Sequence, residues 1–134
     1  FLLINLSVCY GQNNFNEHKN KVQIDTVFSE HLKWKLQRYV DDFLKEKWID
    51  LNDFSYSPEL LDTKEKAAKF AINLILIQYP MVKEDIFTEV QVSEDKSGKI
   101  WFVDVRNSVG YPVHLIVFKS SCRVVYFVKL LLLN

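Results

Sequence analysis

The first half of the chain repeats hydrophobic residues at the spacing of a helix. Between Asp25 and Trp48, apolar side chains recur every three or four residues, at Phe28, Leu32, Leu36, Tyr39, Val40, Phe43 and Leu44. A helix turns once every 3.6 residues, so this spacing gathers them on one face. The intervening positions carry Lys, Arg and Asp side chains, which are typical of a face in contact with water. We predict an amphipathic helix here, followed by a polar loop that Trp48, Phe54 and Tyr56 pack onto the core.

A second helix is predicted from Asp62 to Gln78. Asp62 followed by Glu65 has the spacing of a capping box, in which the first side chain accepts hydrogen bonds from free backbone N–H groups. From Ala67 onward nearly every position is apolar, which indicates a helix that is buried on most sides. Pro80 ends it, because the residue before a proline is pushed out of the helical region.

After Pro80 the pattern changes to the alternation of β-strands. Four strand-like segments, residues 84–94, 100–106, 113–118 and 124–133, are separated by short polar turns. Such short connections favour antiparallel hairpins. The predicted class is therefore α+β: two helical segments followed by a curved antiparallel β-meander of about four strands, with both helices on one face.

The last of these segments, residues 124–133, is apolar at positions that would point to both faces of the sheet. A central strand covered on both sides accounts for this pattern. The alternative is an apolar edge that docks against a second copy of the chain and forms a homodimer.

The N-terminal residues resemble the end of a signal peptide. An apolar run precedes Cys9 and Gly11, which stand three and one positions before a cleavage point ahead of Gln12. The run is too short to span a bilayer. We expect residues 1–11 to be a signal-peptide remnant, 12–24 a flexible lead and 25–134 a single domain, in an exported protein that is periplasmic or secreted.

Two alternatives concern the cysteines. Leu6-Ser7-Val8-Cys9 also has the form of a lipoprotein box, in which Cys9 would carry a lipid anchor. After cleavage ahead of Gln12, Cys122 would be the only cysteine left, and its apolar neighbours predict a buried thiol. If Cys9 is retained, a disulfide between Cys9 and Cys122 stays open.

Composition and motifs argue against several classes of function. Lys plus Arg and Asp plus Glu both number 17, so the chain lacks the basic field that nucleic acids require. Three glycines and the absence of a phosphate loop or a C-x-x-C motif argue against nucleotide and redox cofactors. His18, His31 and His114 do not have the spacing of metal ligands. We predict neither a cofactor nor a metal.

No catalytic centre is evident either. Asp41 and Asp42 are consecutive in a helix, so their carboxylates diverge by about 100°. The alternative is that Asp104 and Glu89 converge with Asp41 as acid and base. We predict a non-enzymatic protein without catalytic residues.

From Asp62 onward, about half of the chain resembles the small NTF2-fold immunity proteins of bacteria, within the wider cystatin-like and NTF2-like α+β group. The resemblance is carried by the helix opening at 63–71, the strand start at 100–103, the turn Gly110-Tyr111-Pro112 and the strand 113–119. It implies a protein that binds a partner, such as a toxin that it neutralises, through the concave face of its sheet, with Trp101, Tyr111 and His114 as partner-binding residues. The alternative within the same group is a small-ligand-binding protein or enzyme whose cone-shaped pocket these three residues line.

Overall fold

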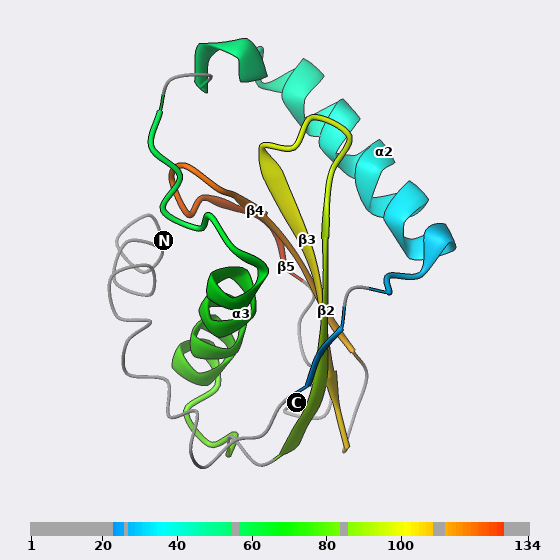
Figure 1. Cartoon of the computed structure of the whole chain (residues 1–134), viewed down its shortest axis with the longest axis vertical. Helices are drawn as coiled ribbons and strands as arrows, with labels where there is room; N and C mark the ends of the chain where they lie inside the picture. The colour runs from blue at the N-terminus through cyan, green and yellow to red at the C-terminus, as the bar shows by residue number, and fades with distance from the viewer. Residues whose placement is uncertain (1–22, 26, 55–56, 84–85, 109–111, 128–134) are drawn as a thin grey trace.

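The computed structural model describes residues 23–25, 27–54, 57–83, 86–108 and 112–127 (Figure 1). Two helices precede a β-meander that forms a curved, open sheet, which confirms the predicted α+β class. The elements are β1 (Gln23–Asp25), α2 (Glu30–Glu46), the short 3₁₀-helix η2 (Leu51–Phe54), α3 (Lys64–Gln78), β2 (Phe87–Glu94), β3 (Ile100–Asn107), β4 (Val113–Phe118) and β5 (Val124–Phe127). The expected signal-peptide remnant at 1–11 lies outside the described residues.

The sheet has five strands in the order β1-β2-β3-β4-β5. β2 to β5 pair antiparallel, as predicted, whereas β1 pairs parallel to β2. Residues 23 and 24 therefore form part of a strand in a stretch that was predicted to be a flexible lead. A three-residue strand with one apolar side chain, Ile24 opposite Val90, is too short to show alternation in the sequence.

The two helices cover opposite faces of the sheet (Figure 1), so the prediction that both lie on one face is wrong. Successive strand residues point to opposite faces. Trp101, Val103 and Val105 of β3 pack with α3, whereas Ile100 and Phe102 pack in a second core with Leu36 and Val40 of α2. The near-continuous apolar run of β3 is the sequence signal of this two-sided cover.

Each helix begins at a hydroxyl side chain. The Ser29 hydroxyl accepts a hydrogen bond from the Leu32 N–H at 3.3 Å, and α2 follows it. The Thr63 hydroxyl accepts from the Lys66 N–H at 3.1 Å, so Thr63 and not Asp62 caps α3. The Asp62 carboxylate instead lies 2.7 Å from the Lys66 ammonium. Both hydroxyls satisfy a backbone donor that a first helical turn leaves without an intrahelical partner.

The order of the strands decides the position of the C-terminal segment. β3 is central, and its residues from Ile100 to Val105 are all buried. Among the described strands β5 lies at the edge, and its four residues are half-buried, so the interpretation of this segment as a central strand is wrong. Residues 128–134 of the predicted strand lie outside the described part.

The β2–β3 turn fixes α2 against the sheet. Gly98 adopts a φ of 76°, which few other residues adopt without strain. The Lys96 N–H donates to the Gln37 Oε1 at 2.9 Å, and the Lys96 ammonium lies 3.1 Å from an Asp41 carboxylate oxygen.

Among the described residues, no helix is both long enough and apolar enough to cross a membrane.

Candidate functional site

The C-terminus of α2 holds a tryptophan in an unusual backbone conformation. The Trp48 N–H donates to the Lys45 carbonyl at 3.4 Å, and the Ile49 N–H donates to the Leu44 carbonyl at 3.0 Å. This pair of bonds is a Schellman motif, which closes a helix through a residue of positive φ, commonly Gly. Trp48 occupies that position with a φ of 56°. A left-handed conformation costs an L-residue roughly 1–2 kcal/mol.

Burial does not offset this cost, because the Trp48 side chain is 93% exposed. The sequence led us to expect Trp48 to pack the following loop onto the core, and that expectation is wrong. Phe54 does pack as expected, with its ring 6.0 Å from that of Phe118, while Tyr56 lies outside the described residues. Local stability therefore does not explain why a tryptophan stands at position 48.

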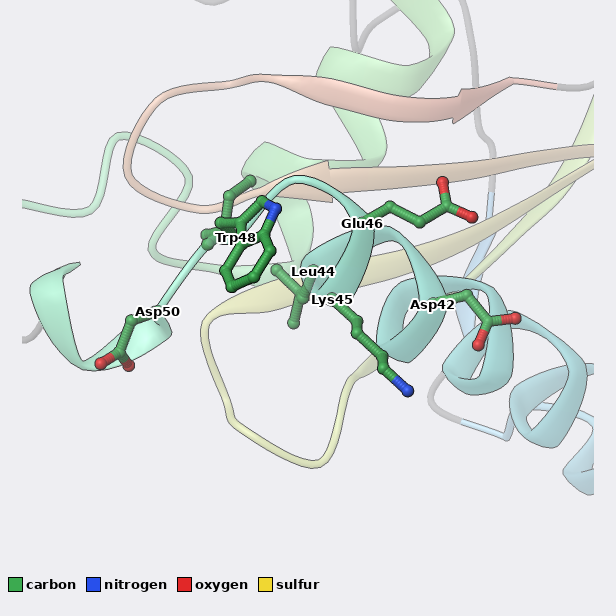
Figure 2. A pocket seen from close by; sticks show the side chains of 7 residues that line it. Asp42, Leu44, Lys45, Glu46, Trp48 and Asp50 are labelled. Carbon is green, nitrogen blue, oxygen red and sulfur yellow. The ribbon is translucent and has the colours of Figure 1, made fainter.

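Trp48 stands beside a hollow of about 830 Å³ at the end of α2 (Figure 2). Leu44 and Ile49 give the hollow apolar surface. The other side chains that line it are charged, and they are Asp42, Lys45, Glu46 and Asp50. Figure 2 shows the Asp50 carboxylate on one side of the Trp48 ring and the Glu46 and Asp42 carboxylates on the other. The site thus combines one large exposed aromatic ring with three carboxylates and one ammonium.

A second exposed tryptophan lies earlier on the same helix. Trp34 is 60% exposed, and the Arg38 guanidinium lies 5.6 Å from its ring centroid. The His31 ring stacks on the Trp34 ring, with 6.3 Å between the ring centroids. The Trp34 ring therefore already contacts a cation and an aromatic ring of its own chain, although it is exposed.

A separate polar cluster lies on the face of the sheet that α2 covers. Gln91, Asp104 and His114 are direct partners in the register of β2, β3 and β4, so their side chains point to the same face. The Asp104 Oδ1 lies 3.6 Å from the His114 Nε2, and the Asp104 Oδ2 lies 3.4 Å from the Arg106 Nη2. Asp104 is 1% exposed, and its Oδ1 and the Gln91 Oε1 are buried without a hydrogen-bond partner.

Burial favours the neutral forms of both titratable groups at the centre of this cluster. Desolvation raises the pKa of the Asp104 carboxyl, and the charges of His114 and Arg106 oppose that rise. Desolvation lowers the pKa of the His114 imidazole, against the attraction of Asp104 and with the repulsion of Lys35 and Arg106. Burial thus opposes a charged Asp104–His114 pair, whereas the Arg106 guanidinium favours the Asp104 carboxylate.

The three carboxylates considered as an acid–base set are not brought together. Asp41 lies at the β2–β3 turn with Lys96, whereas Asp104 lies within β3 opposite Gln91. Glu89 is opposite Arg106. In the part of the chain that the structure describes, no group of three or more His, Cys, Asp and Glu side chains could hold a metal ion.

The structure also separates the residues predicted as partner-binding. Trp101 is buried against α3, with its indole N–H donating to the Leu61 carbonyl at 2.7 Å and the Lys119 ammonium 4.0 Å from its ring centroid. His114 lies on the opposite face and is partly exposed. Tyr111 lies outside the described residues. Trp101 and His114 therefore do not form one recognition face.

In comparisons with known proteins, no protein-family model, curated protein or solved structure matches this chain. The two clusters described above are therefore interpreted from their own geometry.

Proposed function

We propose that this chain is a non-enzymatic protein that binds a partner protein through the surface around Trp48. The observation that carries the proposal is the combination of strain and exposure at this residue. A position where glycine would be favoured is occupied by a large aromatic side chain that gains almost nothing from burial. Covering such a ring in a complex would bury on the order of 200 Å² of mostly apolar surface.

The end of α2 is a better-supported recognition site than the sheet. Both faces of the sheet contribute to cores beneath helices, whereas Trp48 faces solvent. The resemblance to NTF2-fold immunity proteins makes a toxin the class of partner to test first. The proposal thus keeps the implied binding role and moves it from the sheet to the end of α2.

Export is part of the same proposal, and Cys122 supports it. The Cys122 side chain is buried and disulfide-bonded, in contrast to the buried thiol predicted from its neighbours. Structural disulfides persist mainly in oxidising compartments. Cys9 is the only other cysteine in the sequence, so a disulfide within the chain requires that Cys9 is retained and argues against cleavage ahead of Gln12. Intact mass with alkylation before and after reduction tests export, because an unmodified chain that retains Phe1 and carries free thiols would contradict it.

The polar cluster on β2, β3 and β4 favours a second candidate function, the binding of a small polar ligand. The observation behind it is the pair of buried acceptors without partners, Asp104 Oδ1 and Gln91 Oε1. Each would gain a hydrogen bond from a donor group of a ligand. Native mass spectrometry of the purified protein tests this function: a small molecule lost with Asp104→Asn would support it, and a ligand-free mass from native material would oppose it.

The main proposal is tested by affinity capture from native envelope extract, followed by binding measurements with the purified partner. Trp48→Asn is the test variant, because asparagine tolerates positive φ and should leave the fold intact. Loss of a Trp hot spot of about 2 kcal/mol would weaken binding about 30-fold. Trp34→Ala is the matched control for loss of an exposed tryptophan. Equal affinity of wild type and Trp48→Asn would refute the proposed surface.

A further inference from the structure

We infer that the surface around Trp48 takes a lysine or arginine side chain of its partner. This inference rests on the proposed binding function and adds the chemistry of the group that is recognised. Its basis is the charge and geometry of the hollow beside Trp48, where several independent sources of negative potential meet.

The first source is the set of side chains around the ring. Asp42, Glu46 and Asp50 are exposed and line the hollow together with Lys45. Three carboxylates against the Lys45 ammonium leave an excess of negative charge, which the exposed Lys47 next to Trp48 reduces but does not cancel. Figure 2 shows the Lys45 ammonium directed away from the Trp48 ring, so the chain's own cation does not cover the aromatic face.

The second source is the end of the helix itself. Trp48 follows Lys47, the C-cap residue of α2, and the aligned peptide dipoles place about half a negative charge at this end of the helix. The third source is the indole ring, whose face attracts cations most strongly among the aromatic side chains. A cation above the ring would interact favourably with the helix terminus, the ring and the carboxylates.

The two other tryptophans already make the kind of contact that we infer for Trp48. The Arg38 guanidinium lies 5.6 Å from the Trp34 ring centroid, and the Lys119 ammonium lies 4.0 Å from that of Trp101. Trp48 is 93% exposed, which leaves its ring accessible to a group from another molecule. The Trp34 ring, by contrast, already has the Arg38 guanidinium and the His31 ring against it, so a further cation would compete with the chain's own groups there.

This difference provides an internal control for the experiment. The full-length ¹⁵N-labelled chain is titrated with two short peptides that differ in one residue, an arginine in one and its neutral isostere citrulline in the other. The indole N–H signals of Trp48 and Trp34 are followed in the same spectra. We expect saturable shifts of the Trp48 signal with the arginine peptide, little change with the citrulline peptide, and little change at Trp34 with either.

The matched variant is Asp42→Asn/Glu46→Gln/Asp50→Asn, which removes the carboxylates and keeps the ring. Because exposed ion pairs contribute about 0.2–1 kcal/mol each, loss of all three carboxylates should weaken binding of the arginine peptide at least about threefold. Retention of the wild-type pattern of amide signals would show that the variant remains folded. Equal shifts with both peptides, or no shift at Trp48, would overturn the cationic anchor.

Binding measurements with the purified partner then test the cationic anchor and the proposed function separately. If Trp48→Asn weakens partner binding while the triple variant binds as wild type does, the proposed function stands and the cationic anchor is wrong. If both variants weaken binding and added salt weakens the wild-type complex, both are supported. Unchanged binding by both variants would overturn both.

Discussion

At the scale of single residues, substitution of Trp48 tests whether the tryptophan at this position stabilises the fold. We predict that Trp48→Gly increases the free energy of unfolding by about 1 kcal/mol, because glycine adopts the positive φ of this position without steric cost. Urea unfolding measures this change. Lys47→Gly is the control: Lys47 has a φ of −93°, so glycine there should give no gain. A loss of stability in Trp48→Gly would show that the indole contributes to the folded state.

Asp104 makes a prediction about pH. Burial raises its pKa in the folded state above the ordinary value of 3.8, so the folded state prefers the protonated form. The protonated Asp104 carboxyl therefore contributes its full stabilisation below the pKa that it has in the unfolded chain. This stabilisation is lost as the pH rises through the pKa that Asp104 has in the folded state. Asparagine does not titrate at this position. The stability of Asp104→Asn relative to wild type should thus increase as pH rises above the ordinary carboxyl pKa of 3.8.

Thermal unfolding across this pH range measures the difference. Because the charge of His114 opposes the rise in the pKa of Asp104, the comparison is made in both the wild-type and the His114→Gln backgrounds. His114 itself acts in the other direction: its lowered pKa costs stability as pH falls below its ordinary value of 6.5. A stability difference between Asp104→Asn and wild type that is independent of pH would contradict the prediction.

Residue-level features were the hardest to predict from the sequence. The polar residues after Trp48 predicted that the helix ends there. The positive φ of Trp48 could not be predicted, because it results from the way the helix closes and tryptophan is not typical of that conformation. Trp101 and His114 lie on opposite faces because of the pairing register of β3 and β4. A shift of one residue in that register would reverse the face to which each side chain points, and the sequence does not fix the register. The buried position of Asp104 could be read only as an interruption of an apolar run.

At the scale of elements, the start of α3 can be tested through its cap. Thr63→Ala should lower the free energy of unfolding by about 1 kcal/mol, because the Lys66 N–H loses the hydroxyl that accepts its hydrogen bond. Thr63→Ser keeps that acceptor and should stay close to wild type, as measured by urea unfolding. Asp62→Asn should have less effect than Thr63→Ala if Thr63 is the cap. An equal loss in Thr63→Ala and Thr63→Ser would contradict this assignment.

The elements themselves could be predicted from periodicity, while their ends and packing depended on tertiary contacts. The alternation after Pro80 identified β2, β3 and β4, and the apolar positions identified both helices. Asp62 and Thr63 are both good caps, so the choice between them was not decided by sequence pattern. The prediction of both helices on one face was wrong, although successive residues of β3 are apolar on both faces of the sheet, a pattern typical of a strand covered on both sides.

At the scale of the whole molecule, the two layers around the sheet differ in how much they bury. α3 has seven buried residues, whereas α2 has two, Leu36 and Val40. Each fully buried aliphatic or aromatic side chain contributes about 1.5–3 kcal/mol. Separation of α2 from the sheet should therefore cost less free energy than separation of α3, and the proposed binding surface lies on the more weakly held layer.

Native-state hydrogen exchange tests this difference, since it reports the free energy of local opening. We predict that amides in the middle of α2 exchange through a partial opening, while those in the middle of α3 exchange only on global unfolding. Low concentrations of denaturant should accelerate exchange in α2 less steeply than in α3, because the partial opening exposes less surface than global unfolding. Leu36→Ala should increase exchange in α2 with little effect on α3. If both helices exchange with the same free energy and the same denaturant dependence, the molecule opens as one unit, and α2 is not a separately mobile binding layer.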